Sequence, residues 1–239
     1  MKNLYSLFPR LAHRGIFAAV IAAAAVMALF SHSAYSAQQA APDANYRFCF
    51  LIYKDVDEDI VKALAPAIET DFRFKVEILD KRPQMPAAAF DKKRKQYRAA
   101  GVLEDAMKHK TPDCVRLVAF VPGDMYLGKQ DFTYGLADTD WRGAVISFAR
   151  LASGEKKRFY LRAYKASLHE LGHTFGLVHC AVEDGCIMTP PRSISALDAA
   201  PAKFCRADRR KLDDAIERLK RQLYGGAAGQ GQKPAETPF

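Results

Sequence analysis

The chain has 239 residues, of which 49% are hydrophobic and 26% are charged, and its formal net charge at pH 7 is +9. This composition is that of ordinary globular proteins, and the length is sufficient for one domain with a sizeable core. The basic side chains are mixed with acidic ones or follow helical patterns, which is typical of solvated helix faces. We therefore expect no nucleic-acid binding.

Residues 1–36 have the organisation of an export signal. Three basic residues precede an apolar run over residues 15–30, and Ala34-Tyr35-Ser36 matches a small-x-small cleavage pattern. We predict cleavage after Ser36, which lowers the net charge from +9 to +6. The mature protein is then periplasmic or secreted, with no stable membrane anchor. The alternative is an uncleaved anchor, for which the apolar run is slightly short.

Strand and helix patterns alternate along the rest of the chain. The predicted elements are, in chain order, a strand at 46–53, a helix at 57–72, a strand at 74–80, a helix at 88–109, strands at 115–122, 132–138 and 144–150, and helices at 156–177 and 203–224. Pro66 predicts a kink or an early end of the first helix. This order predicts a single α/β (α+β) domain with a mixed five-stranded sheet. A flexible start (37–45) and a disordered tail (225–239) flank it.

The stretch HELGHTFGLVH, at 169–179, carries the chain's clearest chemical signal. His169 and His173 are four residues apart, hence about 40° apart around a helix axis, so both can bind one metal ion. Glu170 is about 100° from His169, beside the metal, where a base acting on water belongs. Gly176 permits the left-handed conformation that ends a helix, and we expect His179 to swing back to the metal there.

Three neutral histidines predict a catalytic zinc with one open coordination position, where the pKa of a water falls towards about 7. Glu170 can take a proton from that water and pass it to a leaving amine, while the metal polarises the carbonyl group. This chemistry is amide hydrolysis without a covalent intermediate. The alternative is a helix whose histidines recur by chance, against which the length of the pattern argues.

The pattern H-E-x-x-H-x-x-G-x-x-H resembles that of the metzincin zinc peptidases, which also carry a methionine turn beneath the metal. Met188, nine residues after His179, fits this turn; the alternative is an ordinary core methionine. The segments that follow the histidines, and FDKKRKQYRAAGVLEDAM, YGLAD and AVISFARL upstream, resemble the archaemetzincins. The resemblance covers most of residues 46–224. It implies a metzincin-like domain with an active-site helix, a Met-turn and a C-terminal helix, and a second, structural zinc on four cysteines.

The cysteine pattern departs from that family. Five residues instead of four separate Cys180 from Cys186, and sixteen instead of seventeen separate Met188 from Cys205. The fourth cysteine position is Asp208, whose carboxylate can also ligate zinc. The alternatives are therefore a Cys180/Cys186/Cys205/Asp208 zinc site or a Cys180–Cys186 disulfide in an oxidising compartment.

Two further features bear on the core and on substrate binding. Cys49 and Cys114 lie on predicted buried strands; we favour core thiols, the alternative being a disulfide if the strands are neighbours. Metzincins generally bind peptides along an edge strand, which by analogy is the strand at 132–138. Some of them place a tyrosine two residues after the Met-turn methionine, where this chain has Pro190.

These features predict an exported zinc metallopeptidase, expected to be a monomer, that acts on a peptide or protein substrate. One alternative is a zinc hydrolase acting on a non-peptide amide. Another is a zinc-binding protein of the same fold with little or no peptidase activity. The presence of Glu170 argues against the latter, because binding zinc does not require a base.

Overall fold

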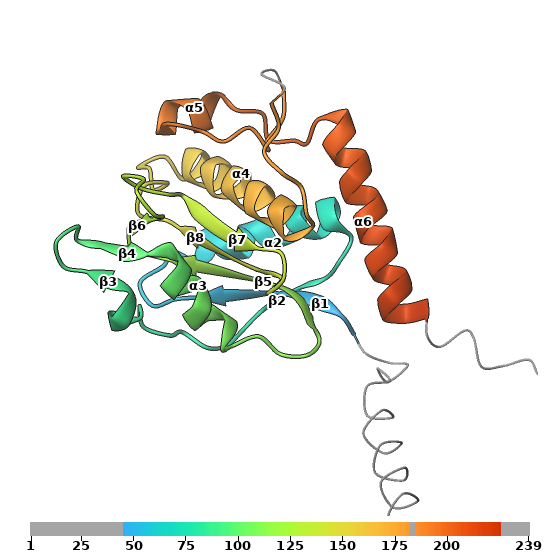
Figure 1. Ribbon diagram of the computed structural model, residues 1–239, viewed down its shortest axis with the longest axis horizontal. Coiled ribbons are helices and arrows are strands. Elements are labelled where there is room, and N and C mark those ends of the chain that lie inside the picture. The colour runs from blue at the N-terminus through green and yellow to red at the C-terminus, as the bar shows by residue number, and fades with distance from the viewer. Residues whose placement is uncertain (1–44, 182–184, 226–239) are drawn as a thin grey trace, which may run out of the picture. The chain divides into compact units, whose positions relative to one another are not determined.

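The computed structural model describes residues 45–181 and 185–225. The predicted export signal lies outside these residues, as do the predicted start and tail apart from Asn45 and Gly225. Within the described part, five strands form one sheet in the order β2-β1-β5-β8-β7 (Figure 1). They are β1 Arg47–Ile52, β2 Val76–Ile78, β5 Cys114–Val121, β7 Gly135–Asp138 and β8 Gly143–Ser147. All neighbours are parallel except β7 and β8, so the prediction of a mixed five-stranded sheet is confirmed.

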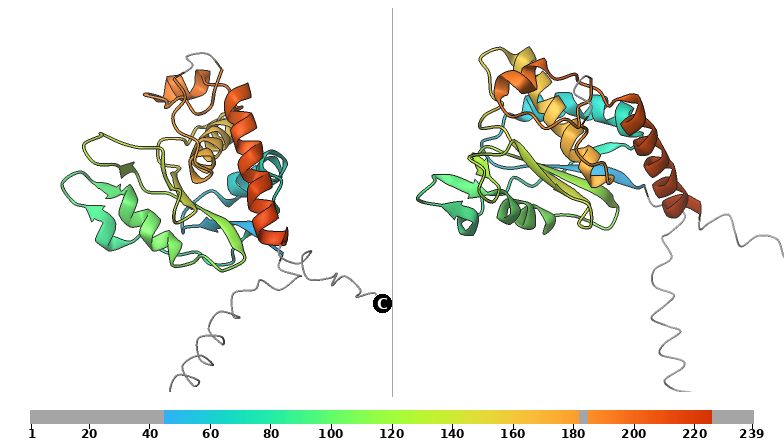
Figure 2. Two further views of the ribbon diagram at one scale, coloured as in Figure 1. Left: turned by 45° about the vertical axis from the view of Figure 1, so that its right-hand side comes forward. Right: turned by 45° about the horizontal axis from the view of Figure 1, so that its top comes forward.

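Helices cover both faces of this sheet (Figures 1 and 2). Helices α2 Glu58–Phe72 and α4 Lys156–Thr174 pack on one face, and α3 Ala99–Met107 packs on the other. The short helix α5 Ile194–Ala199 contacts α4, and α6 Arg206–Tyr224 lies beside the end of α2. In the described ranges, no helix is both long enough and apolar enough to cross a membrane.

Apart from Arg47 and Arg116, the residues of the central strands β1 and β5 are apolar, because both faces of these strands are covered. All eight residues of β5 and five of the six in β1 are buried, as expected for parallel strands between two helical layers. The rings of Phe50 and Phe120 meet edge to face across these strands, with centroids 5.1 Å apart. A fully buried side chain of this size contributes about 1.5–3 kcal/mol, so this pair of strands forms the centre of the core.

Cys49 and Cys114 form a disulfide between β1 and β5, with their Cα atoms 5.7 Å apart. The prediction of core thiols is therefore wrong. The alternative was a disulfide if the two strands are neighbours, and β1 and β5 do pair directly in the sheet. That Cα separation is within the usual range for disulfides.

Helix α2 continues through Pro66 to Phe72, so the predicted early end does not occur. The side chain of Asp57 caps its start by accepting hydrogen bonds from the backbone N–H groups of Asp59 and Ile60. Apolar residues on both sides of the proline, among them Leu64, are fully buried. Packing of this face therefore outweighs the lost backbone hydrogen bond.

The predicted helix at 88–109 is correct only in its second half, which is α3. The first half is a 3₁₀ turn at Ala87–Ala89 followed by β3 Phe90–Asp91 and β4 Gln96–Arg98, which join β6 Met125–Tyr126 in a small sheet. The Asp91 carboxylate accepts hydrogen bonds from the N–H groups of Lys93 and Arg94 at 2.9 and 3.2 Å. Such local side-chain bonds offer the backbone a turn in place of a helix.

Candidate metal-binding active site

Helix α4 directs the first two histidines of the cluster to one point. His169 and His173 are one turn apart on this helix, and their Nε2 atoms lie 3.1 Å from each other. Leu168 and Leu171 are buried and anchor the helix in the core. Because side chains at i and i+4 lie above one another on a helix, this spacing places both imidazoles side by side.

The chain reverses direction directly after α4. The helix ends at Thr174, three residues before its predicted end, and Gly176 adopts a φ of +84°. The Gly176 N–H donates to the carbonyl of His173 at 2.9 Å, and the Leu177 N–H donates to that of Gly172 at 3.1 Å. These bonds satisfy carbonyl groups at the helix end, as in a glycine-terminated helix. The predicted role of Gly176 agrees with this geometry.

The reversal brings His179 to the other two histidines. Its ring centroid lies 5.3 Å from that of His169 and 4.9 Å from that of His173, and one ligand atom of each residue lies within 4.8 Å of the others. The Nδ1 atoms of His169 and His173 donate to the carbonyls of Ile187 and Leu177, both at 2.8 Å. Their Nε2 lone pairs are thus left for a metal ion. Burial lowers the pKa of His169 to about 4, which keeps this imidazole neutral and able to bind a metal.

Glu170 lies beside this cluster, with its side chain close to strand β7. A Cβ atom added at Gly135 would lie 2.6 Å from both Cγ and Oε1 of Glu170, so the strand admits the carboxylate only because this residue has no side chain. Burial raises the pKa of Glu170 to about 8. The role of Gly135 was not predicted from the sequence, although a glycine inside a strand often marks such a close approach.

Met188 lies beneath the helix that carries the histidines. It is fully buried, and a Cβ atom added at Gly172 would lie 2.6 Å from its sulfur, so the glycine makes room for it. The N–H of Cys180, next to His179, donates to the Met188 carbonyl at 3.0 Å. The methionine turn is therefore bonded to the segment that positions the third histidine. Pro190 lines the adjoining cleft.

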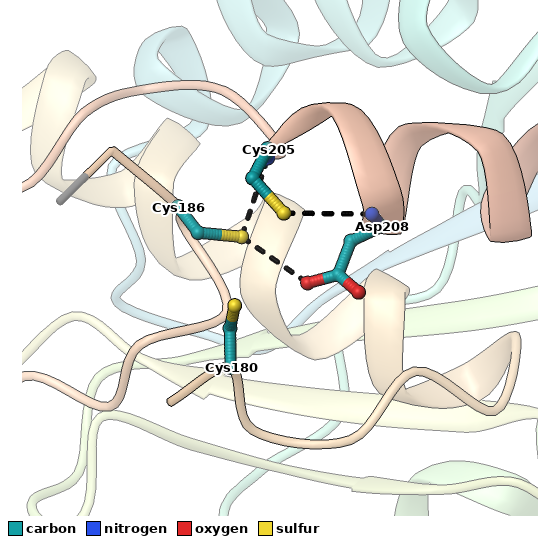
Figure 3. Close-up of side chains that lie close together, drawn as sticks. All are labelled: Cys180, Cys186, Cys205 and Asp208. Atoms are coloured by element: carbon teal, nitrogen blue, oxygen red, sulfur yellow. Dashed lines mark hydrogen bonds between the residues drawn. The ribbon is translucent and has the colours of Figure 1, made fainter. Parts of the chain in front are cut away.

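Three cysteines and one aspartate form a second cluster at the start of α6 (Figure 3). One ligand atom each of Cys180, Cys186, Cys205 and Asp208 lies within 4.8 Å of the others. All three thiols are free, so the alternative of a Cys180–Cys186 disulfide does not occur in the structure. The Cys186 thiol donates to Asp208 Oδ2 at 3.2 Å. Three sulfur atoms and a carboxylate are a donor set that suits zinc.

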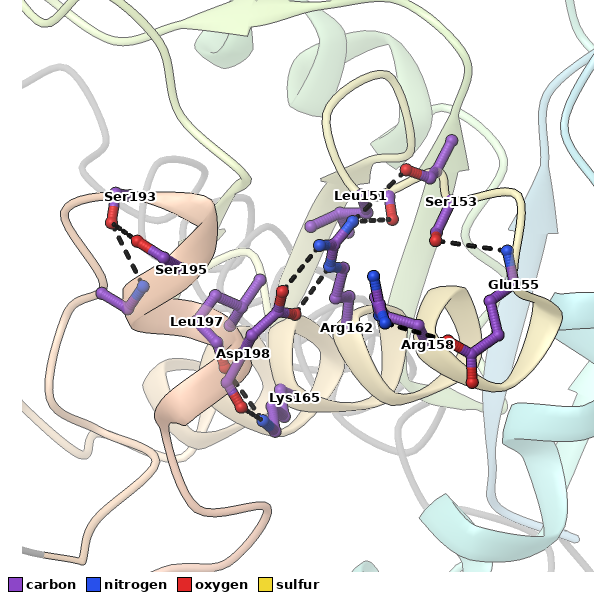
Figure 4. Close-up of polar contacts among 12 residues, drawn as sticks. Leu151, Ser153, Glu155, Arg158, Arg162, Lys165, Ser193, Ser195, Leu197 and Asp198 are labelled. Atoms are coloured by element: carbon purple, nitrogen blue, oxygen red, sulfur yellow. Dashed lines mark hydrogen bonds and ion pairs between the residues drawn. The ribbon is translucent and has the colours of Figure 1, made fainter.

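A cleft of about 1020 Å³ opens over the histidines, with β7 along one side. β7 is the outer strand of the sheet, as predicted for the strand at 132–138. Lys165, one turn before His169, lines the cleft and is 7% exposed. Its ammonium group donates to the carbonyls of Leu197 and Asp198 at 2.9 and 2.7 Å (Figure 4). The Asp198 carboxylate pairs with Arg162 instead, so the Lys165 ammonium uses two of its three donor positions and forms no ion pair with a described carboxylate.

Comparison with known proteins identifies the family to which this chain belongs. A family model described as peptidase family M54 matches residues 48–214. The chain belongs to peptidase family M54. An archaemetzincin of Saccharolobus solfataricus is 31% identical over 179 residues, which cover 72% of this chain and 91% of the relative. An archaemetzincin of Methanopyrus kandleri is 33% identical over 137 residues, which cover 57% of this chain and 77% of the relative.

Solved structures agree with this assignment. The crystal structure of the M. kandleri archaemetzincin has a TM-score of 0.66 at 27% identity, and the match covers 75% of this chain and 99% of that chain. A zinc-dependent peptidase from Methanocorpusculum labreanum has a TM-score of 0.62 at 26% identity, covering 69% of this chain and 99% of that chain. The predicted archaemetzincin-like fold is therefore confirmed, and the chain is a zinc metallopeptidase, a hydrolase.

Proposed function

We propose that the chain hydrolyses peptide bonds with Glu170 as the general base and acid, on a zinc ion held by His169, His173 and His179. When bound, zinc supplies a Lewis acid that polarises the substrate carbonyl and acidifies water. The observation that supports this proposal most directly is that Glu170 and the three histidines line the same cleft, with one ligand atom of each histidine within 4.8 Å of the others. Glu170 accepts a proton from water there and delivers it to the leaving amine.

Replacing Glu170 by Gln tests this role, because glutamine keeps the shape of the side chain but cannot accept the proton. We expect kcat/KM on peptides to fall by about 10²–10⁴-fold, with one zinc still bound at the histidines. Glu155→Gln is the matched control: Glu155 is exposed, lies at the start of the same helix and pairs with Arg158. Equal activity of Glu170→Gln and wild type would reject the mechanism. A wild type that binds zinc but cleaves no peptide would favour the zinc-binding alternative or a non-peptide amide.

Lys165 supports a proposal for the class of substrate. We infer that the protein prefers peptides with an acidic side chain next to the scissile bond, because Lys165 lines the cleft one turn before His169 and forms no ion pair with any described carboxylate. A charge-assisted hydrogen bond contributes about 1.5–3 kcal/mol, equivalent to a preference of roughly 10- to 100-fold over the amide. This inference depends on the peptidase activity proposed above.

Paired peptides that carry Glu or Gln at each of four positions around the cleaved bond test the preference. We expect wild type to prefer Glu at one position and Lys165→Met to lose that preference while it still cleaves the Gln peptides. Lys157→Met, an exposed lysine of the same helix, is the control. Equal cleavage of Glu and Gln peptides at all four positions by wild type would reject the substrate proposal, and cleavage of neither would reject the activity.

We also propose that Cys180, Cys186, Cys205 and Asp208 hold a second, structural zinc ion. Their donor atoms are close together, and all three thiols are free. Burial raises the pKa of the Cys186 thiol to about 12, so a metal ion would have to displace its proton. Such a site would fix Cys180, and with it the adjacent His179.

Export is a further proposal: cleavage after Ser36 would release a monomeric protein into the periplasm or the medium. The Cys49–Cys114 disulfide supports an oxidising compartment. Intact-mass analysis of the protein from an exporting host is the test. A mature chain that begins at or near Ala37 is the expected result, and an intact Met1 on a membrane-bound chain would reject it.

A further inference from the structure

A second cavity adjoins the C-terminal end of α4, between β5 and α6. Its volume is about 260 Å³, and three of the side chains that line it are arginines: Arg116, Arg142 and Arg218. Lys110 is close enough that the charges of Arg116 and Arg142 lower its pKa, after burial, to about 8. Three arginines of the described chain therefore line one small cavity, and Lys110, which is not among the lining residues, adds a positive charge nearby.

Arg116 is the unusual member because it is only 6% exposed. Its Nε donates to the hydroxyl of Thr174 at 3.1 Å, its Nη1 donates to the carbonyl of Val115 at 2.7 Å, and its guanidinium carbon lies 4.2 Å above the ring of Phe175. All three partners are neutral. Among the described residues, Nη2 has no hydrogen-bond acceptor, and because it is not one of the fully buried atoms that lack a partner, it keeps some contact with solvent. A buried guanidinium group without a counter-charge is costly, because its lost hydration is only partly replaced.

The described part of the chain supplies no carboxylate that balances these charges. Across residues 45–181 and 185–225, none of the ion pairs includes Lys110, Arg116, Arg142 or Arg218. The acidic residues of the nearby turn do not pair with them either: Asp138 accepts from the N–H of Trp141 instead. The cavity is therefore a preformed cationic site.

We propose that this cavity binds a tetrahedral oxyanion of the phosphate class. Guanidinium groups present a planar set of N–H donors that matches phosphate oxygens in bidentate contacts. The volume is about nine times the ~30 Å³ that a water molecule occupies in the liquid, which suits a phosphate group with a few waters. A bound anion would give Arg116 its missing counter-charge. It would also link β5 to the turn that carries Arg142 and to helix α6 through Arg218.

The experiment is thermal unfolding and calorimetric titration of the zinc-loaded protein with inorganic phosphate, at constant ionic strength set with chloride. A ligand that binds only the folded state raises the unfolding midpoint. At a 50-fold excess over Kd we expect a rise of about 5 °C for a chain of this length. Sulfate, which has the same shape, should raise the midpoint as well. The absence of any shift with 50 mM phosphate would overturn the proposal.

Two variants assign the shift to this cavity. Arg218 is exposed on α6, so the variant Arg218→Gln should fold normally. It should lose most of the phosphate-dependent rise in the unfolding midpoint. Arg116→Met should lose it completely. Arg210→Gln is the control, because Arg210 is also exposed on α6 but lies about 12 Å away along the helix, at 1.5 Å per residue. Phosphate that binds at the catalytic metal would raise the unfolding midpoint of every variant by the same amount. A phosphate-dependent rise in Arg218→Gln equal to that of the wild type would therefore overturn the proposal.

Discussion

Among single residues, two glycines matter to the site because their lack of a side chain leaves room for a neighbouring one. Gly172 leaves room for the Met188 sulfur, and Gly135 leaves room for the Glu170 carboxylate. In both cases an added methyl group would come within 2.6 Å of the neighbouring side chain. Real Cβ contacts are longer than this, so the neighbour would have to move in any variant that carries a side chain.

Gly135→Ala is therefore expected to displace Glu170 without removing any ligand of the catalytic metal. A displacement of about 1 Å can cost on the order of 100-fold in rate, and we expect kcat/KM to fall by about 10- to 100-fold while zinc content stays unchanged. Gly154→Ala is the control, because a Cβ atom there meets nothing within 4 Å. Peptide hydrolysis and metal analysis of both variants are the measurements, and full activity of Gly135→Ala would contradict the proposed position of the base.

Among the helices and strands, the start of α6 is where this chain differs from the four-cysteine pattern of the archaemetzincins, because Asp208 stands in the position of the fourth cysteine. Asp208 lies three residues after Cys205, whose sulfur accepts from the Asp208 N–H at 3.5 Å. Asp208 is 4% exposed, and Lys211 donates to its Oδ1 at 3.2 Å. A buried carboxylate next to three thiols supports the proposal that Asp208 is a zinc ligand in place of the fourth cysteine.

We expect two zinc ions per chain in the wild type and one in Asp208→Ala, because three remaining ligands bind zinc more weakly. Asp208→Cys should keep two zinc ions, since it restores a four-cysteine set. Metal analysis after gel filtration is the measurement, with Asp214→Ala, an exposed change on the same helix, as control. Two zinc ions in Asp208→Ala would show that Asp208 is no ligand.

Helices and strands that bury a regularly spaced set of apolar residues could be predicted from the sequence. Those determined by hydrogen bonds between a side chain and the nearby backbone could not. α4 and β5 follow their predicted ranges closely, because the apolar spacing that burial requires is visible in the sequence. The hairpin before α3 was missed because Asp91 bonds to its own turn. Helix α5 was missed because it is only six residues long and is capped by Ser193.

The residues of the candidate site likewise fall into those that could be predicted from the sequence and those that could not. His169, His173 and His179 could be predicted because their spacing on one helix and its turn fixes their directions. The contributions of Gly135 and Lys165 depend on how β7 and α5 pack against α4, which no local spacing reveals. The Cys49–Cys114 pairing likewise required the strand order, because it joins residues 65 positions apart.

At the scale of the whole molecule, that disulfide closes a large part of the fold. It joins β1 to β5, so α2, β2 and α3 all lie in the loop between its cysteines. In the chain-entropy model, a loop of this length lowers the entropy of the unfolded state by an amount worth about 4 kcal/mol, and measured values for disulfides are usually about 2–4 kcal/mol. The bond should therefore contribute a large share of the total stability, which for a domain is about 5–15 kcal/mol.

We expect the double variant Cys49→Ala/Cys114→Ala to lose about 2–4 kcal/mol of unfolding free energy, measured by denaturant titration. Reducing agent should lower the stability of the wild type by a similar amount and leave the double variant unchanged. This comparison separates the disulfide from the Cys180/Cys186/Cys205 cluster, whose thiols are free and would respond alike in both proteins. Thiol titration of the unfolded, zinc-free wild type should give three reactive groups. Five groups, or equal stability of the two proteins, would contradict the disulfide and remove its support for an oxidising compartment.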